Sequence, residues 1–135
     1  MSTPTASGRC VCGALRYEVS GPLRGVIVCH CVECRRFNGT SGAYSASAAS
    51  DLAIDDPEGV LRWFPGPESA TGGERGFCGR CGSSMFWREP ERTTVSIAAG
   101  TLNGATGLRI IQHIWDEQRA DWELEDDLPR LPRGT

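Results

Sequence analysis

The sequence contains no lysine, because its fourteen basic residues are all arginines. No side chain can therefore form a Schiff base with a carbonyl substrate, which excludes aldehyde chemistry by that route. No apolar run approaches the roughly 20 residues of a membrane-spanning helix. The net charge is −3 and there is no basic tail. We therefore expect neither nucleic acid nor a membrane as a partner.

A targeting signal is also missing from the beginning of the sequence. Residues 1–7 contain no apolar core of a signal peptide and predict a loose leader. A length of 135 residues suits one domain with a core of its own. We expect that domain over residues 8–132, a short tail over residues 133–135 and a cytoplasmic location. The sequence leaves the oligomeric state open.

Long helical patterns are scarce, whereas turn-forming residues are plentiful, with 17 glycines and 8 prolines. This balance predicts a mainly β fold of small antiparallel sheets with little helix. Residues 35–42 are expected to form a loop with at most one helical turn, and residues 65–76 a longer loop. Alternating or β-branched patterns predict strands over residues 14–19, 25–28, 43–48, 51–55, 60–64, 93–99 and 108–115.

Seven cysteines fall into three tight groups. An odd number in clusters argues against a disulfide framework, and cytoplasmic thiols are kept reduced. Metal ligation is therefore the favoured interpretation. The groups are Cys10 and Cys12; Cys29, Cys31 and Cys34; and Cys78 and Cys81.

The spacing of these groups predicts two zinc ions per chain. The motif C-G-R-C-G at residues 78–82 is a zinc knuckle that supplies two thiolates, and C-V-C-G at residues 10–13 supplies two more. Together Cys10, Cys12, Cys78 and Cys81 make a closed structural site. The remaining trio of Cys29, Cys31 and Cys34 has three ligands and an open fourth position, which is the arrangement of catalytic zinc.

A second interpretation of the trio is a closed site of three cysteines and one histidine. His30 lies between two of the cysteines, so in an extended backbone its side chain points away from theirs. His113 is remote in sequence and remains a candidate for the fourth ligand. If either histidine completes the trio, the second site is structural as well.

The residues around the trio suggest further roles. Arg35 and Arg36 follow the last cysteine and can offset the negative charge of three thiolates or bind a substrate carboxylate. His30 can orient ligands or move protons, whereas Glu33 is expected to be an ordinary surface residue. Five aromatic residues are assigned to the core rather than to a substrate cage: Trp63, Phe64, Phe86, Trp87 and Trp115.

Three segments resemble the glutathione-dependent formaldehyde-activating enzyme family, which shares a domain with centromere protein V. They are G-R-C-V-C-G-A-L-R-Y-E-V, C-H-C-V-E-C-R-R-F-N-G and F-C-G-R-C-G-S-S-M-F-W. The closing H-I-W-D-E-Q-R-A-D-W-E-L-E-D-D-L-P-R-L-P is similar to the family's last segment, so the resemblance covers residues 8–132. It implies a zinc-bound β-tent fold, a structural zinc on Cys10, Cys12, Cys78 and Cys81, and a catalytic zinc on Cys29, Cys31 and Cys34.

The resemblance also implies a carbon–sulfur lyase or synthase that reversibly joins glutathione to formaldehyde. The chemistry of the trio agrees, since three thiolates make zinc a poor generator of hydroxide but a good partner for a soft thiol. Our first hypothesis is therefore an enzyme that makes or cleaves adducts of a small thiol, such as glutathione, with an aldehyde. The alternative is a zinc-stabilised binding module without turnover.

Overall fold

The computed structural model of the protein describes residues 4–67, 69 and 71–134. These residues form ten strands, one α-helix and three short 3₁₀ turns, which confirms the mainly β prediction. The elements are β1 (Ala6–Arg9), β2 (Arg16–Val19), β3 (Val26–Cys29), α1 (Val32–Asn38), β4 (Gly42–Ala48), η1 (Ala49–Asp51), β5 (Leu52–Asp55), β6 (Leu61–Pro65), β7 (Glu74–Cys78), β8 (Ser84–Arg88), β9 (Thr94–Ala98), η2 (Ala99–Thr101), β10 (Ile110–Ile114) and η3 (Asp116–Gln118).

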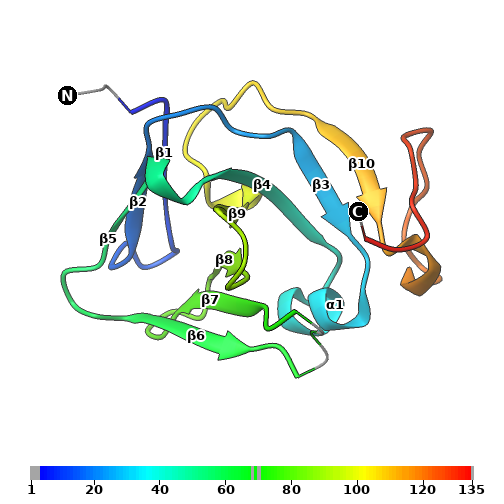
Figure 1. Ribbon diagram of the computed structural model, residues 1–135, viewed down its shortest axis with the longest axis horizontal. Coiled ribbons are helices and arrows are strands. Elements are labelled where there is room, and N and C mark those ends of the chain that lie inside the picture. The colour runs from blue at the N-terminus through cyan, green and yellow to red at the C-terminus, as the bar shows by residue number, and fades with distance from the viewer. Residues whose placement is uncertain (1–3, 68, 70, 135) are drawn as a thin grey trace.

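The strands form two sheets (Figure 1). A small antiparallel sheet has the order β1-β2-β5, and a seven-stranded sheet has the order β10-β3-β4-β9-β8-β7-β6. All neighbours in the larger sheet are antiparallel except β3 and β10, which are parallel. Parallel partners need a long connection, and here it spans most of the chain. In Figure 1 the small sheet lies at one side and β10 at the other.

The helix α1 differs from the expected loop at residues 35–42. It begins inside the cysteine-rich stretch, where Cys31 is the N-cap and its Sγ accepts a hydrogen bond from the backbone N of Cys34 at 3.3 Å. Gly39 ends it with φ 79°, a left-handed conformation that glycine adopts without strain. Because a thiol takes the place of the usual hydroxyl or carboxylate cap, the sequence offered no ordinary helix signal here.

The ends of the chain also differ in part from the expectation. Strand β1 begins at Ala6 and pairs with β2, so residues 6 and 7 of the expected loose leader belong to the small sheet. Residues 1–3 of that leader and residue 135 of the expected tail lie outside the described residues. Within the described part of the chain, no helix is long and apolar enough to cross a membrane.

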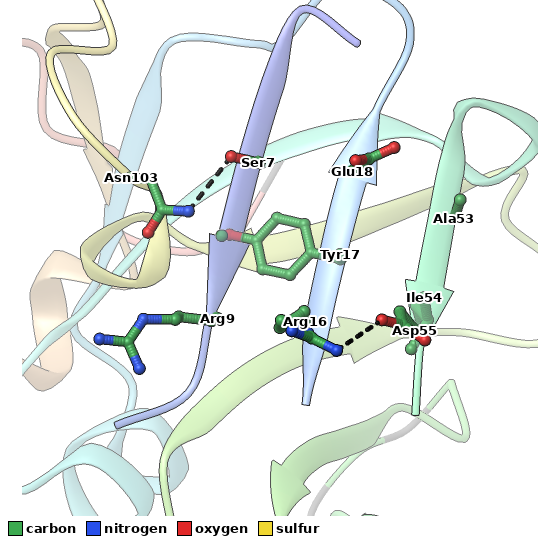
Figure 2. A pocket seen from close by; sticks show the side chains of 10 residues that line it. Ser7, Arg9, Arg16, Tyr17, Glu18, Ala53, Ile54, Asp55 and Asn103 are labelled. Atoms are coloured by element: carbon green, nitrogen blue, oxygen red, sulfur yellow. Dashed lines mark hydrogen bonds and ion pairs between the residues drawn. The ribbon is translucent and has the colours of Figure 1, made fainter. Parts of the chain in front are cut away.

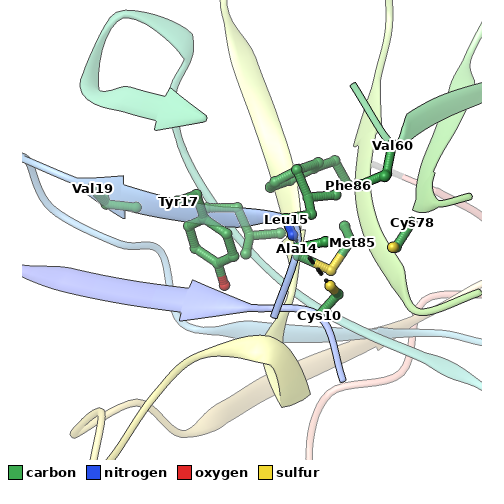
Figure 3. Packing of buried hydrophobic residues seen from close by; sticks show 10 residues of the cluster. Cys10, Ala14, Leu15, Tyr17, Val19, Val60, Cys78, Met85 and Phe86 are labelled. Atoms are coloured by element: carbon green, nitrogen blue, oxygen red, sulfur yellow. Dashed lines mark hydrogen bonds between the residues drawn. The ribbon is translucent and has the colours of Figure 1, made fainter. Parts of the chain in front are cut away.

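The core lies where the small sheet packs on the middle of the larger one (Figure 3). Tyr17 and Phe86 meet edge to face there, with ring centroids 5.4 Å apart. Leu15 and Met85 are fully buried beside them. Cys10 and Cys78 belong to the same cluster, so one cysteine of the first group and one of the third are part of the core.

The small sheet is joined to η2 through Gly8 and Tyr17. Gly8 forms an isolated antiparallel bridge with Leu102. The Tyr17 hydroxyl lies 2.7 Å from Thr101 Oγ1, which itself donates to the carbonyl of Ala98. Tyr17 is therefore the donor in this pair, and burial agrees with that role because it raises the pKa of Tyr17 to about 12.

The closeness of Gly8 to these groups predicts a large effect of one added methyl group. A Cβ at Gly8 would lie 2.2 Å from Tyr17 Oη and 2.5 Å from the carbonyl oxygen of Thr101. We expect Gly8→Ala to lower the free energy of unfolding by about 2 kcal/mol, as overpacking does. Gly100→Ala is the control, because its Cβ meets no atom within 4 Å. Urea unfolding measures both, and equal stabilities of the two variants would contradict the prediction.

Candidate functional site

The first and third cysteine groups meet at the edge of the core as a four-sulfur cluster, in which Cys10 and Cys78 are buried and Cys12 and Cys81 are exposed. The ligand atoms of Cys10, Cys12, Cys78 and Cys81 all lie within 4.8 Å of one another. Cys12 Sγ lies 3.6 Å from Cys10 Sγ and 3.9 Å from Cys78 Sγ. Four sulfurs placed about 2.3 Å from one tetrahedral ion would be about 3.8 Å apart, whereas a disulfide needs about 2.05 Å. The cluster therefore fits a single zinc ion and not a disulfide.

Two similar turns aim these sulfurs. Gly13 donates to the carbonyl of Cys10 and Gly82 donates to that of Cys78, and both glycines have φ near 80°. Backbone N–H groups of Leu15 and Cys81 lie 3.4 Å from the sulfurs of Cys10 and Cys78. Such contacts stabilise thiolates, which is the ionisation state that a metal requires.

The second group forms a separate trio of sulfurs. The ligand atoms of Cys29, Cys31 and Cys34 lie within 4.8 Å of one another, and in the described part of the chain no histidine or carboxylate joins them. Cys29 ends β3, Cys31 caps α1 and Cys34 is in its first turn. The short connection between β3 and α1 therefore brings the three thiols close together.

The three thiols cannot all ionise unaided, because their charges repel one another. Hydrogen bonds from Cys29 and Cys34 lower the pKa of Cys31 to about 2. Hydrogen bonds of Cys29 with Cys31 and then with Cys34 raise the pKa of Cys29 far above its usual range. Only a bound cation would allow three thiolates together, so the donor set fits a soft divalent ion such as zinc.

Arg75 is the cation that lies against the trio. Arg75 is buried, with 4% of the residue exposed, and its Nη2 donates to Cys34 Sγ at 3.4 Å. Its Nε donates to Glu33 Oε1 at 2.8 Å, so Glu33 is not the ordinary surface residue that we expected. Arg75 thus takes the charge-compensating role for which the sequence suggested Arg35 and Arg36.

Neither Arg35 nor Arg36 lines the pocket at the trio. Both follow Cys34 on α1, where Arg36 is exposed and Arg35 is half-buried with an Nε that has no partner. Arg75 lies in β7, more than forty residues further along the chain, and nothing in the sequence singled it out. Its pairing with the trio depends entirely on the packing of β7 beside α1.

The trio opens into a pocket of about 400 Å³. Its lining includes all three cysteines, Tyr44, and the side chains of Trp87 and Trp115. These two tryptophans, which we had assigned to the core, therefore face the pocket, whereas Phe86 is a core residue as expected. Trp115 is also the one non-glycine residue with positive φ among those described, at 54°.

Both histidines lie close to the trio without joining it. His30 Nε2 is 2.8 Å from His113 Nδ1, and the two rings stack. The other nitrogen of His30 bonds Glu123 at 2.9 Å, and that of His113 bonds Asp126 at 3.0 Å. Because every ring nitrogen has a partner, neither imidazole has a lone pair directed at the trio.

The row Glu123–His30–His113–Asp126 contains three hydrogen bonds. Burial opposes the ionisation of Glu123, but the Ala120 N–H and the nearby His30 hold the pKa of this carboxyl below its usual range. The N–H of Leu128 and then His113 lower the pKa of Asp126. When both carboxylates are ionised, each of the three hydrogen bonds in the row needs a proton on an imidazole nitrogen. Two neutral imidazoles carry only two such protons.

This row fastens the C-terminal segment to the trio loop. The backbone supports it, since His113 N donates to Pro129 O and Leu131 N donates to His113 O. Gln118 Oε1 also accepts from the first N–H of α1, that of Val32, at 2.9 Å. The segment after β10 is thus bonded to the loop of the trio, and Figure 1 shows this segment beside β10.

A larger hollow, of about 580 Å³, lies elsewhere, on the outer face of the small sheet (Figure 2). Four of its polar side chains bond one another in pairs: Arg16 pairs with Asp55 at 3.2 Å, and Asn103 Nδ2 donates to Ser7 Oγ at 3.1 Å. It contains no cysteine or histidine. The pocket at the trio is smaller but holds the reactive groups, so it is the candidate site.

The burial of Arg75 predicts a strong effect of removing its charge. We expect Arg75→Gln to lower the free energy of unfolding by about 3 kcal/mol, because it breaks an ion pair whose guanidinium is buried. Arg16→Gln is the control, since both members of its ion pair are more than half exposed, and it should change stability by less than about 1 kcal/mol. Denaturant unfolding of both variants measures the difference, and similar losses would be inconsistent with a special role of Arg75.

The lowered pKa of Glu123 predicts a pH-dependent contribution to stability. A carboxyl with a folded-state pKa below its unfolded value stabilises the fold at neutral pH and loses this effect as pH falls through the folded-state pKa. We expect Glu123→Gln to cost about 2 kcal/mol at pH 7, and the gap to wild type to shrink below the usual carboxyl value of 4.5. Glu125→Gln, at an exposed ion pair with Arg119, should have little effect. A gap that stays constant from pH 7 to pH 3 would refute this.

Comparisons with known proteins support a family assignment. A crystal structure of a Rhodobacter sphaeroides protein is similar, with a TM-score of 0.60 and 22% identity over 75% of this chain and 91% of that chain. At this identity the likeness establishes the fold alone. A comparison with curated protein sequences found no match. The model of the family described as glutathione-dependent formaldehyde-activating enzyme matches residues 5–118, and the chain therefore belongs to that family.

Proposed function

We propose that the protein is a zinc-dependent carbon–sulfur lyase or synthase of the cytoplasm. It would reversibly join a small thiol of the glutathione type to an aldehyde such as formaldehyde. The observation that carries the proposal is the trio of Cys29, Cys31 and Cys34, which gathers three sulfurs at the wall of a pocket without a fourth side-chain ligand among the described residues. Family membership supports the choice of glutathione and formaldehyde.

The residues present suit this division of two metal sites. We assign a structural zinc to Cys10, Cys12, Cys78 and Cys81, and a catalytic zinc to the trio. Zinc bound to three thiolates supplies an open position for a soft ligand and lowers the pKa of a thiol held there. The neighbouring Arg75 offsets the excess negative charge of the three thiolates.

Tyr44 provides a proton donor at the same pocket. Its hydroxyl accepts a hydrogen bond from Asn38 Nδ2 at 3.1 Å, which leaves its own proton available to a ligand. Burial, followed by the charge of Cys34, raises the pKa of Tyr44, so the phenol stays protonated. We assign it the task of donating a hydrogen bond to the aldehyde oxygen.

The reaction needs no other group. In the forward direction the thiol sulfur bonds to the carbonyl carbon, and the carbonyl oxygen gains the proton that the thiol gives up. The reverse reaction breaks the same carbon–sulfur bond and returns that proton to sulfur. The chain has no lysine to activate the aldehyde as a Schiff base, so hydrogen bonding and a positioned thiolate must be sufficient.

Metal content and activity of two cysteine variants test the proposal. We expect two zinc ions per wild-type chain by native mass spectrometry, one for each cysteine cluster. Cys31→Ala should lose one ion and all activity while it stays folded. Cys81→Ala, in the cluster built into the core, should lose several kcal/mol of stability, since structural zinc binding is worth on the order of 10 kcal/mol.

The rate of exchange between formaldehyde and its glutathione adduct, followed by NMR, measures the activity. A single zinc ion per chain would contradict the two-site division, and unfolding of Cys31→Ala would make the trio structural. A protein with both zinc ions that does not accelerate the exchange would instead be a zinc-stabilised binding module.

A further inference from the structure

We propose that Arg24 and Arg92 bind a carboxylate of the thiol substrate and make the protein selective for peptide-sized, anionic thiols. This inference rests on the proposed function, because it concerns the same pocket. Both arginines line that pocket together with Cys29, Cys31 and Cys34. They are therefore placed to contact the part of a ligand that extends away from the trio.

Among the described residues of the pocket, one arginine has no carboxylate partner. Arg75 pairs with Glu33 at 2.8 Å, and Arg92 pairs with Glu89 at 2.9 Å. Arg24 is the remaining arginine of the lining, and no carboxylate among the described residues forms an ion pair with it. An anionic ligand would supply the missing partner.

Arg24 is held in place by the backbone. Its Nη2 donates to the carbonyl of Tyr44 at 2.8 Å, and its Nε donates to that of Gly25 at 3.1 Å. These two bonds fix the plane of the guanidinium and leave its other N–H groups for a ligand. A fixed guanidinium loses little conformational freedom when it binds a carboxylate.

Arg92 adds a second positive charge close to Arg24. Burial and then the charge of Arg92 lower the pKa of Arg24, so the two guanidinium groups repel each other. Arg92 lies over the ring of Trp87 at 5.9 Å from its centroid, at the limit of a cation–π contact. A carboxylate shared by the two arginines would replace this repulsion with two attractive contacts.

The position of the Arg24 guanidinium sets the size of the ligand. It is bonded to the carbonyl of Tyr44, which pairs with Ile27 in the sheet, two residues before Cys29. Two residues along a strand are about 7 Å. Each residue of an extended peptide adds at most about 3.6 Å, so a di- or tripeptide thiol is long enough to place its sulfur at the trio and a carboxylate at Arg24.

Calorimetric titration of the zinc-loaded protein tests the inference with four probes. Glutathione has a thiol and two carboxylates, its diethyl ester has only the thiol, S-methylglutathione has only the carboxylates, and cysteamine is a short thiol without a carboxylate. We expect glutathione to bind about 10- to 100-fold more tightly than the diester or cysteamine, the range for charge-assisted hydrogen bonds. Arg24→Gln/Arg92→Gln should reduce glutathione affinity to that of the diester.

Arg16→Gln is the matched control, because this exposed arginine lies outside the pocket, on the small sheet. It should leave all four affinities unchanged. The comparison of glutathione with its diester uses the unaltered protein, so the test does not depend on the folding of any variant. Equal affinities for glutathione and its diester would overturn the inference. A failure of both glutathione and S-methylglutathione to bind would overturn it as well.

The failures of this inference and of the proposed function are distinguishable. If the trio does not bind thiols but the arginines bind carboxylates, glutathione and S-methylglutathione bind equally and both need Arg24 and Arg92. If the trio binds thiols but the arginines do not bind carboxylates, glutathione and its diester bind equally and both lose affinity in Cys31→Ala. The first result supports the carboxylate site, and the second contradicts it.

Discussion

The convergence of two cysteine turns in the interior is the constraint on which the rest of the structure depends. The turn at residues 10–13 follows the first strand, and the turn at residues 78–82 connects β7 to β8. Their four sulfurs lie within 4.8 Å of one another, and Cys10 and Cys78 pack among the side chains that form the core. A cation shared by these turns would fasten the small sheet to the larger one.

The two cysteine clusters have the same donor atoms but different surroundings. Four thiolates around a divalent ion leave more excess negative charge than three thiolates do. Cys12 is exposed, however, so water screens this excess charge. The trio has no fully exposed cysteine, and the buried guanidinium of Arg75 lies beside it. Fewer ligands, a compensating cation and an adjoining pocket distinguish a site that can exchange its fourth ligand from one that is closed.

The trio depends on segments that are distant in sequence. Strand β3, helix α1 and its N-cap provide the thiols, and β7 provides Arg75. Strand β10 contributes the bonds of His113, and the segment after it contributes those of Gln118 and Glu123. The histidine row is therefore a fastening between the C-terminal segment and the loop of the trio. Its hydrogen bonds explain why both histidines lie near the cysteines while their ring nitrogens are directed at each other and at carboxylates.

The sequence by itself determined what depends on local chemistry. Alternating patterns located most strands, and cysteine spacing predicted both clusters, because a turn of two or three residues places its own sulfurs together. Only the tertiary structure decided which charged groups face the trio. Arg75 and Arg24 reach the pocket through strand pairing, the parallel partnership of β3 and β10 brings His113 to His30, and α1 begins at a thiol cap. Such contacts join residues up to 93 positions apart, and no short-range pattern encodes them because they are set by how the strands pair and pack.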